Sequence, residues 1–253
     1  MQNTLSRFAV SVWYRFTIDG LVHTPTLRHS VSAACMLYKR SFEVKGRFSM
    51  YRNFSNETFY DQESPFQSLI NTGTCVIRIP NRDTIAGIKS DIKFLATVLD
   101  APEEGEILLE DFDAQLQELA DIASKIPQEE HKRVYFEIAP TPNMYSCGSG
   151  SFINEMIEWI GAENVLADQS GWFTVEGETI VSANPDFIFT NADYMDDPVQ
   201  EILDRDGWAD ISAIASKNVY SIDSNSSSHS NHTIVKAMRQ MAEILYPDYY
   251  TTK

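Results

Sequence analysis

The chain has 253 residues and a mass of 28.7 kDa, enough for one large domain or two smaller lobes. Hydrophobic residues make up 43% and charged residues 22%, a composition typical of a globular protein that excludes wholesale disorder. The formal charge of −16 argues against nucleic acid and against an anionic membrane surface as partners, and three cysteines are too few for a disulfide framework.

This charge is unevenly distributed along the chain. Residues 1–60 hold eight Lys and Arg against three Asp and Glu, a net +5, whereas residues 61–253 carry −21. Neither helical nor strand periodicity persists in residues 1–60, and polar residues interrupt the apolar stretch before the Ser-Ala-Ala-Cys sequence at 32–35. We therefore expect no convincing signal peptide there, and leave residues 1–60 unassigned as divergent or disordered.

From residue 61 the pattern becomes regular. An apolar run at 76–79, closed by a proline, predicts a buried strand. Apolar residues spaced three and four apart predict a helix over 83–99. A longer apolar stripe over 102–126 predicts a second helix, with a proline in its first turn and acidic residues near its positive end.

Beyond residue 127 the chain alternates between predicted strands and predicted helices. The strands are expected at 134–138, 187–189 and 218–222, and the helices at 152–161, 198–204 and from Thr233 onward. Such alternation predicts an α/β lobe in which helices cover both faces of a parallel sheet. Ligands of these sheets bind beyond the carboxyl ends of the strands.

Three polar loops follow these predicted strands, at 140–151, 191–197 and 223–232, and a fourth lies at 168–172. They carry aromatic rings, hydroxyls, amides and two histidines, and so suit a polar ligand with flat apolar surfaces. We refer to them as the four binding loops.

An enzyme is disfavoured by the same loops. Cys147 has no base at an identifiable spacing, and the adjacent Gly-Ser-Gly lacks the lysine or third glycine of a phosphate-binding loop. His229 and His232 could share a metal ion on a helical turn, but without a third ligand at a definite spacing we favour a polar loop or a helix cap.

Several motifs of the carboxyl-terminal half stand in a definite order. They are Gly-Ser-Phe at 150–152, Gly-Ala-Glu-Asn-Val at 161–165, Trp172 before a Val-x-x-Glu helix, Asn-Pro-Asp at 184–186, Gly-Trp-x-x-Ile-x-Ala-Ile at 207–214 and Tyr-Pro-Asp at 246–248. Together they resemble the carboxyl-terminal lobe of the iron–siderophore and cobalamin class of ABC-transporter substrate-binding proteins, the class III periplasmic binding proteins with a helical backbone.

This resemblance implies parallel-sheet lobes with flanking helices, joined by a long backbone helix. Residues 61–82 would be the remnant of an otherwise missing amino-terminal lobe, 83–127 the helical backbone and 128–253 the ligand-binding lobe. Family members are not enzymes and need no cofactor: they bind a ferric siderophore, haem or cobalamin and deliver it to the transmembrane permease. The resemblance also implies a monomer at the extracellular face of the membrane or in the periplasm.

The resemblance assigns roles to individual residues as well. Six would line the ligand cleft, namely Tyr145, Trp172, Tyr194, His229, Asn231 and His232. Aromatic faces would pack on the ligand, and a histidine would ligate a metal centre or donate a hydrogen bond. The sequence Ser-His-Ser-Asn-His at 228–232 stands where siderophore binders often place arginine, which disfavours an anionic tricatecholate and favours a corrinoid or a neutral chelate.

Glu178 occupies the position of the carboxylate that pairs with arginines of the permease. The alternative is that it only stabilises the start of a helix. Two other functions stay open at this point: an intracellular interaction or scaffold protein built on an orphan lobe, and a metal-ion binder that uses His229 and His232.

Overall fold

The computed structural model describes residues 47–52, 71, 74–79 and 81–250. Contacts within the chain divide it into two units, the first made of residues 1–81 and 90–108 and the second of residues 82–89 and 109–253. The rest of the segment 1–60, which the sequence left unassigned, lies outside the described residues.

In the first unit, β1 (Arg47–Arg52) pairs in parallel with β2 (Thr74–Ile79). The strand predicted at 76–79 is therefore confirmed. β1 lies in the segment for which the sequence predicted no element, because its pairing depends on a partner distant in the chain and not on local periodicity.

Two helices, α3 (Ile85–Val98) and α4 (Pro102–Ala123), contribute residues to both units and confirm the two predicted helices. Within the first unit, a Cβ at Gly105 would lie 2.3 Å from the Cβ of Ala96, so only glycine permits this close approach of α4 to α3. Within the described residues, every helix is too short or too polar to cross a bilayer.

The second unit is built on a parallel sheet with the strand order β5-β3-β7-β8. The strands are β3 (Arg133–Glu137), β5 (Glu163–Asn164), β7 (Phe187–Thr190) and β8 (Val219–Ser221). The three predicted strands and the parallel sheet are thus confirmed, and β5 is added at one edge.

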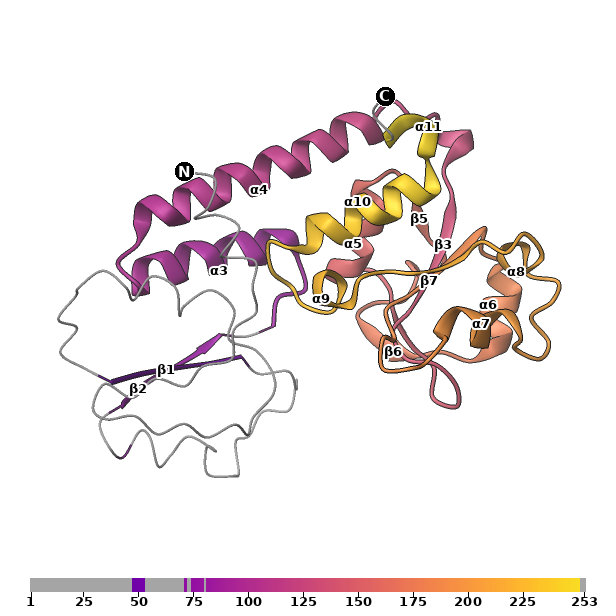
Figure 1. The fold of residues 1–253 in the computed structure, drawn as a ribbon, viewed down its shortest axis with the longest axis horizontal. Helices are drawn as coiled ribbons and strands as arrows, with labels where there is room; N and C mark the ends of the chain where they lie inside the picture. The colour runs from indigo at the N-terminus through magenta and orange to yellow at the C-terminus, as the bar shows by residue number, and fades with distance from the viewer. Residues whose placement is uncertain (1–46, 53–70, 72–73, 80, 251–253) are drawn as a thin grey trace. The chain divides into compact units, whose positions relative to one another are not determined.

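Both faces of this sheet are buried, as expected for a parallel sheet. Tyr135 and Ile188 belong to a core that also contains Ile180, Ile202 and Trp208. The helices on this face are α6 (Gly177–Ala183), α7 (Pro198–Leu203) and α8 (Ser212–Ala215). Since side chains alternate along a strand, Phe136 and Phe189 point to the opposite face. There lie α5 (Phe152–Trp159) and α10 (Ile234–Leu245), as Figure 1 shows.

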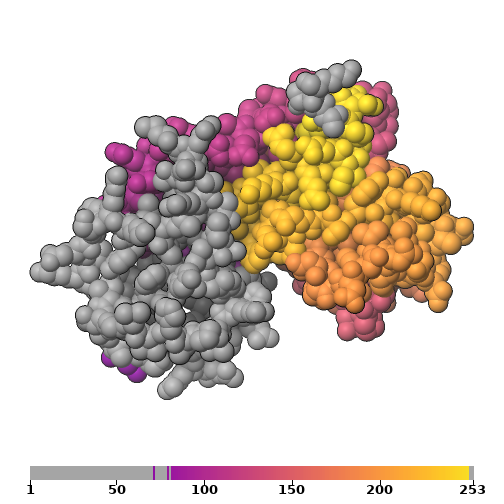
Figure 2. Space-filling model, viewed as in Figure 1, coloured from indigo at the N-terminus to yellow at the C-terminus, as the bar shows by residue number. Residues whose placement is uncertain are grey.

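The carboxyl-terminal segment fastens the second unit together. The hydroxyl of Tyr246 accepts a hydrogen bond from the N–H of Lys132 at 2.8 Å and donates one to the carbonyl of Gly161 at 2.6 Å. In α11 (Pro247–Tyr250), the hydroxyl of Tyr250 donates to the carbonyl of Leu119 in α4 at 3.1 Å. The yellow carboxyl-terminal helices and the orange segment before them form one continuous surface in Figure 2.

We predict that Tyr246→Phe lowers the free energy of unfolding by about 1 to 3 kcal/mol, because it leaves a backbone donor and a buried carbonyl without their partner. Tyr249→Phe is the matched control, since it removes an exposed hydrogen bond to Glu130, at 3.2 Å, from the neighbouring helix α11. Urea denaturation of both variants checks the prediction. Equal losses in the two variants would contradict it.

Candidate ligand-binding site

Three of the four binding loops lie at one edge of the sheet, because they follow the carboxyl ends of the adjacent strands β3, β7 and β8. Asn191 joins them. Its buried side-chain amide donates to the hydroxyls of Ser227 at 3.1 Å and Ser228 at 3.2 Å, and its backbone N–H donates to the carbonyl of Glu137 at 3.4 Å. Asn191 thus ties the loops after β7 and β8 to the last residue of β3. We call this edge of the sheet, with the loops that follow its three strands, the carboxyl edge.

Tyr145 and Trp172 lie on a short antiparallel ribbon and not in irregular loops as the sequence suggested. β4 (Tyr145–Cys147) pairs with β6 (Trp172–Thr174), with Cys147 opposite Trp172 and Tyr145 opposite Thr174. Residues in this register share a face, so the two aromatic side chains lie on the same side of the ribbon. Local periodicity could not reveal strands of three residues.

The side chain of Trp172 is held by two neighbours. Its Nε1–H donates to Oδ1 of Asp83, just before α3, at 3.0 Å. Its ring lies against that of Phe152, with centroids 5.4 Å apart. The half-buried indole is therefore fixed before any ligand arrives.

The Gly-Ser-Gly sequence has a structural role. The N–H of Gly148 donates to the carbonyl of Gly171 at 2.9 Å, and the N–H of Ser149 donates to that of Gln169 at 2.8 Å. A Cβ at Gly148 would lie 2.0 Å from the carbonyl oxygen of Gln169, so glycine is required where these two loops touch. The hydroxyl of Ser151 then caps α5.

The buried side-chain amide of Asn164 is hydrogen-bonded to β4. The side chain of Asn164 donates to the carbonyl of Cys147 and to Oδ1 of Asn154, both at 3.0 Å, and accepts from the N–H of Leu166 at 3.1 Å. Burial raises the pKa of the Cys147 thiol to about 12, so that it stays protonated and is no nucleophile.

A buried ion pair lies at the end of β3, and the sequence did not predict it. The guanidinium of Arg205 donates to both carboxylate oxygens of Glu137, at 2.7 and 3.0 Å, and also pairs with Glu201. The two paired side chains are 8% and 1% exposed. The guanidinium also lies 4.3 Å above the ring of Trp208. A glutamate inside an apolar strand was the one signal that such a partner exists.

The charges of this pair depend on each other. Burial raises the pKa of Glu137, while the hydrogen bonds and the charge of Arg205 oppose that rise. Burial acts to lower the pKa of Arg205, but hydrogen bonds to Glu137 and Glu201 outweigh it and raise the pKa. The guanidinium therefore stays charged, and Glu137 requires it in order to ionise at neutral pH.

Tyr194 is 69% exposed and follows β7. Desolvation and the charges of Glu137 and Asp193 raise its pKa, which places the phenol within electrostatic reach of the end of β3. Tyr194 adds an exposed aromatic ring to the half-buried pair on the ribbon.

The last binding loop carries three of the predicted ligand-binding residues, Asn231, His232 and His229, and their environments differ. Oδ1 of Asn231 accepts from the N–H and the hydroxyl of Thr233, at 2.7 and 2.6 Å, directly before α10. Burial and the charge of Lys236 lower the pKa of His232, whereas Asp111 of α4 acts in the opposite direction. His229 is half-buried. Among the described residues, no three His, Cys, Asp or Glu side chains are grouped to hold a metal ion.

Glu178 is exposed in the first turn of α6. The neighbouring Gly177 packs beside Trp208, since a Cβ there would lie 3.4 Å from the indole nitrogen. The Trp208 ring thus packs against the first turn of α6, which carries Glu178.

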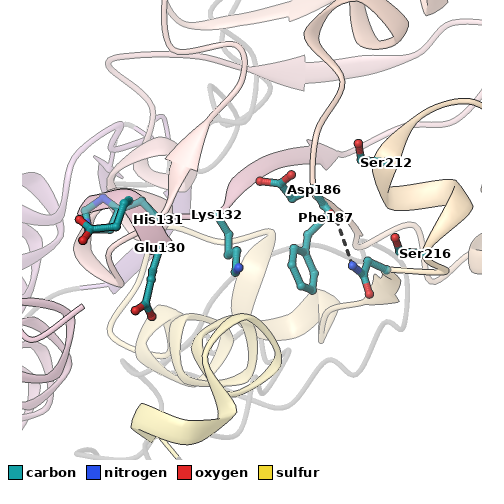
Figure 3. Close-up of a pocket in the computed structure, with 9 residues that line it drawn as sticks. Glu130, His131, Lys132, Asp186, Phe187, Ser212 and Ser216 are labelled. Carbon is teal, nitrogen blue, oxygen red and sulfur yellow. Dashed lines mark hydrogen bonds between the residues drawn. The ribbon is translucent and has the colours of Figure 1, made fainter. Parts of the chain in front are cut away.

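A pocket of about 340 Å³ lies at the opposite edge of the sheet, where β3, β7 and β8 begin (Figure 3). It is bordered by the turn η2 (Gln128–Glu130) and lined by polar side chains around Phe187. Asp186 and Asn218 meet there through a hydrogen bond to the Asp186 carbonyl at 3.3 Å. None of the four binding loops contributes a residue to this pocket.

Comparison with known sequences gives a match to the periplasmic binding protein family over residues 56–226. The uncharacterized ABC transporter substrate-binding lipoprotein YvrC of Bacillus subtilis is 29% identical over 184 residues, which are 73% of this chain and 58% of YvrC. The molybdate-binding protein MolA of Haemophilus influenzae is 31% identical over 135 residues, 53% of this chain and 37% of MolA. The chain thus spans less than two thirds of either relative.

Among solved structures, the periplasmic haem-binding protein RhuT from Roseiflexus sp. RS-1 superposes with a TM-score of 0.66 and 18% identity. The match covers 81% of this chain and 76% of RhuT. It shows a shared fold.

We predict that Arg205→Met lowers the free energy of unfolding by about 3 to 5 kcal/mol at neutral pH, because it leaves the Glu137 carboxylate buried and unpaired. The pKa of Glu137 in the folded variant then lies further above its unfolded value. The folded state binds the extra proton, so stability decreases as pH rises from about 5 to 8. Denaturation across that range measures the slope.

Glu137→Gln in the Arg205→Met background is the control, because it removes the titrating group. We expect it to abolish the added pH dependence. A loss of stability in Arg205→Met that is the same at every pH would show that the guanidinium does not hold the charge of Glu137.

Proposed function

Because the chain belongs to the periplasmic binding protein family, whose members bind solutes and are not enzymes, we propose that it is the substrate-binding component of an ABC importer. Its ligand is an iron complex or cobalamin. The observation that supports this is the carboxyl edge, where three neighbouring loops meet and the β4–β6 ribbon presents its rings.

The chemistry of the carboxyl edge suits a metal chelate with a broad apolar surface. Tyr145, Trp172 and Tyr194 offer ring faces, and the hydroxyls around Asn191 offer small polar contacts. Ferric siderophores, haem and cobalamin all combine a metal centre with such a surface. The names of the relatives span molybdate and haem, so the choice among ligands must come from this chain's own residues.

The partner in this proposal is the transmembrane permease, and Glu178 is the carboxylate that docks on it. Two features support that role. Glu178 is exposed, and Trp208 packs against the first turn of its helix, which gives the docking group a rigid support. The protein works as a monomer at the extracellular face of the membrane or in the periplasm.

We predict that a bound chelate quenches tryptophan fluorescence and stabilises the full chain, by about 2.7 kcal/mol at a hundred times its dissociation constant. A panel of ferric chelates, haem, cyanocobalamin and molybdate tests this by titration and thermal unfolding. Trp172→Phe should remove most of the quenching, whereas Trp159→Phe, on α5, should not. The proposal fails if no member of the panel changes either signal.

We predict that Glu178→Ala lowers uptake about tenfold in cells that carry the complete transporter, because a charge-assisted pair with an arginine is lost. Ligand affinity of the purified variant should stay unchanged. Glu243→Ala, an exposed carboxylate on α10, is the control and should leave uptake unchanged. Reduced ligand affinity in Glu178→Ala would contradict the docking role.

A further inference from the structure

The four binding loops carry charges of one sign. Residues 140–151, 168–172, 191–197 and 223–232 contain no Lys or Arg. They contain five aspartates, all exposed: Asp168, Asp193, Asp196, Asp197 and Asp223. Hydrogen bonds from Ser226 lower the pKa of Asp223, which keeps its charge in place. An anion at this edge would meet carboxylates without a compensating cation in the same loops.

Arg205 cannot serve as that cation, because its donors are all in use. A guanidinium has five N–H groups. Those of Arg205 reach both oxygens of Glu137, both oxygens of Glu201 and the sulfur of Met144. One guanidinium is thus shared between two carboxyl groups and offers no free donor to a ligand.

Two further basic side chains of the second unit are engaged in ion pairs outside the four binding loops. Lys89 pairs with Asp113, and Arg239 pairs with Glu118. Arg82 lies beside the last binding loop but outside it: its backbone N–H donates to the hydroxyl of Ser230 at 3.3 Å, and the aliphatic part of its side chain packs over Gly87. Burial and Lys236 lower the pKa of His232, so this imidazole is neutral at neutral pH and adds no positive charge.

The five exposed carboxylates of the binding loops accept hydrogen bonds and cannot donate them. Exposed carboxylates and serine hydroxyls can receive hydrogen bonds from amide N–H, hydroxyl or ammonium groups. The rings of Tyr145, Trp172 and Tyr194 add apolar faces that also attract a cation. These groups complement a ligand that carries donors on its periphery and no net negative charge.

We propose that the carboxyl edge selects a neutral or cationic metal chelate with peripheral donors, and rejects anionic chelates, haem with its two propionates and molybdate included. This inference rests on the proposed function. It deepens that function by naming the charge class of the ligand.

The test uses pairs of ligands that share a core and differ in charge. One pair is a ferric trihydroxamate with a terminal amine and its succinylated, anionic form. The other is cyanocobalamin and a derivative in which one peripheral amide is hydrolysed to a carboxylate. For whichever core the full chain binds, we expect the anionic member to bind about tenfold more weakly at low ionic strength.

The ligand pairs, haem and molybdate together distinguish a failure of this inference from a failure of the proposed function. Tighter binding of an anionic member, of haem or of molybdate overturns this inference and leaves the proposed function standing. If no core binds, the proposed function falls, and the inference falls with it.

A charge-reversal pair locates the effect. Asp193→Arg places a cation in a binding loop and should reduce the discrimination against the anionic member about fivefold to tenfold. Asp210→Arg makes the same change of charge at an exposed position outside the four loops and should leave the discrimination as it was. An equal effect of both variants would overturn the assignment, because the net charge of the protein would then set the preference.

Discussion

The pairing of Glu137 with Arg205 is the constraint on which the carboxyl edge depends. A carboxylate at the end of a buried strand is costly unless a cation and hydrogen bonds satisfy it. Arg205 meets that need and is itself placed by Glu201 of α7 and by the ring of Trp208. Because Trp208 also supports the start of α6, one buried pair links the end of β3 to the helix that bears Glu178. The ligand edge and the predicted docking surface therefore share a support.

Several buried or half-buried polar residues near the carboxyl edge form hydrogen bonds that stabilise the fold. Asn164 holds β4, Asn191 joins the loops after β7 and β8 to the end of β3, and Asn231 accepts hydrogen bonds from Thr233 just before α10. Such networks are rigid when every donor and acceptor is satisfied. Gly-Ser-Phe takes part in this support through Ser151, which caps α5, and Gly-Ala-Glu-Asn-Val takes part through Asn164, which reaches β4 from β5. They set the positions of the rings that a ligand would meet, and need not contact the ligand themselves.

The two edges of the sheet differ in chemistry. The amino-terminal edge has a pocket with Lys132 and His131 beside acidic residues, so charges of both signs meet there. The carboxyl edge has acidic loops, aromatic rings and an arginine that is fully engaged. Proteins with this fold therefore need not bind the same ligand, because the charge of the loops can change while the sheet stays the same. For this physical reason, membership of the family does not identify the ligand.

The sequence by itself determined the alternation of strands and helices, and so the parallel sheet and the edge at which its loops gather. Those features follow from local hydrophobic periodicity, as the strand at 134–138 and the stripe of α4 illustrate. Only the tertiary structure decided that Tyr145 and Trp172 share a ribbon face, that β1 pairs with β2, and that Arg205 reaches Glu137 across 68 residues. Strands of three residues and buried ion pairs leave no periodic pattern. They are specified by partners far away in the chain, which a local pattern cannot record.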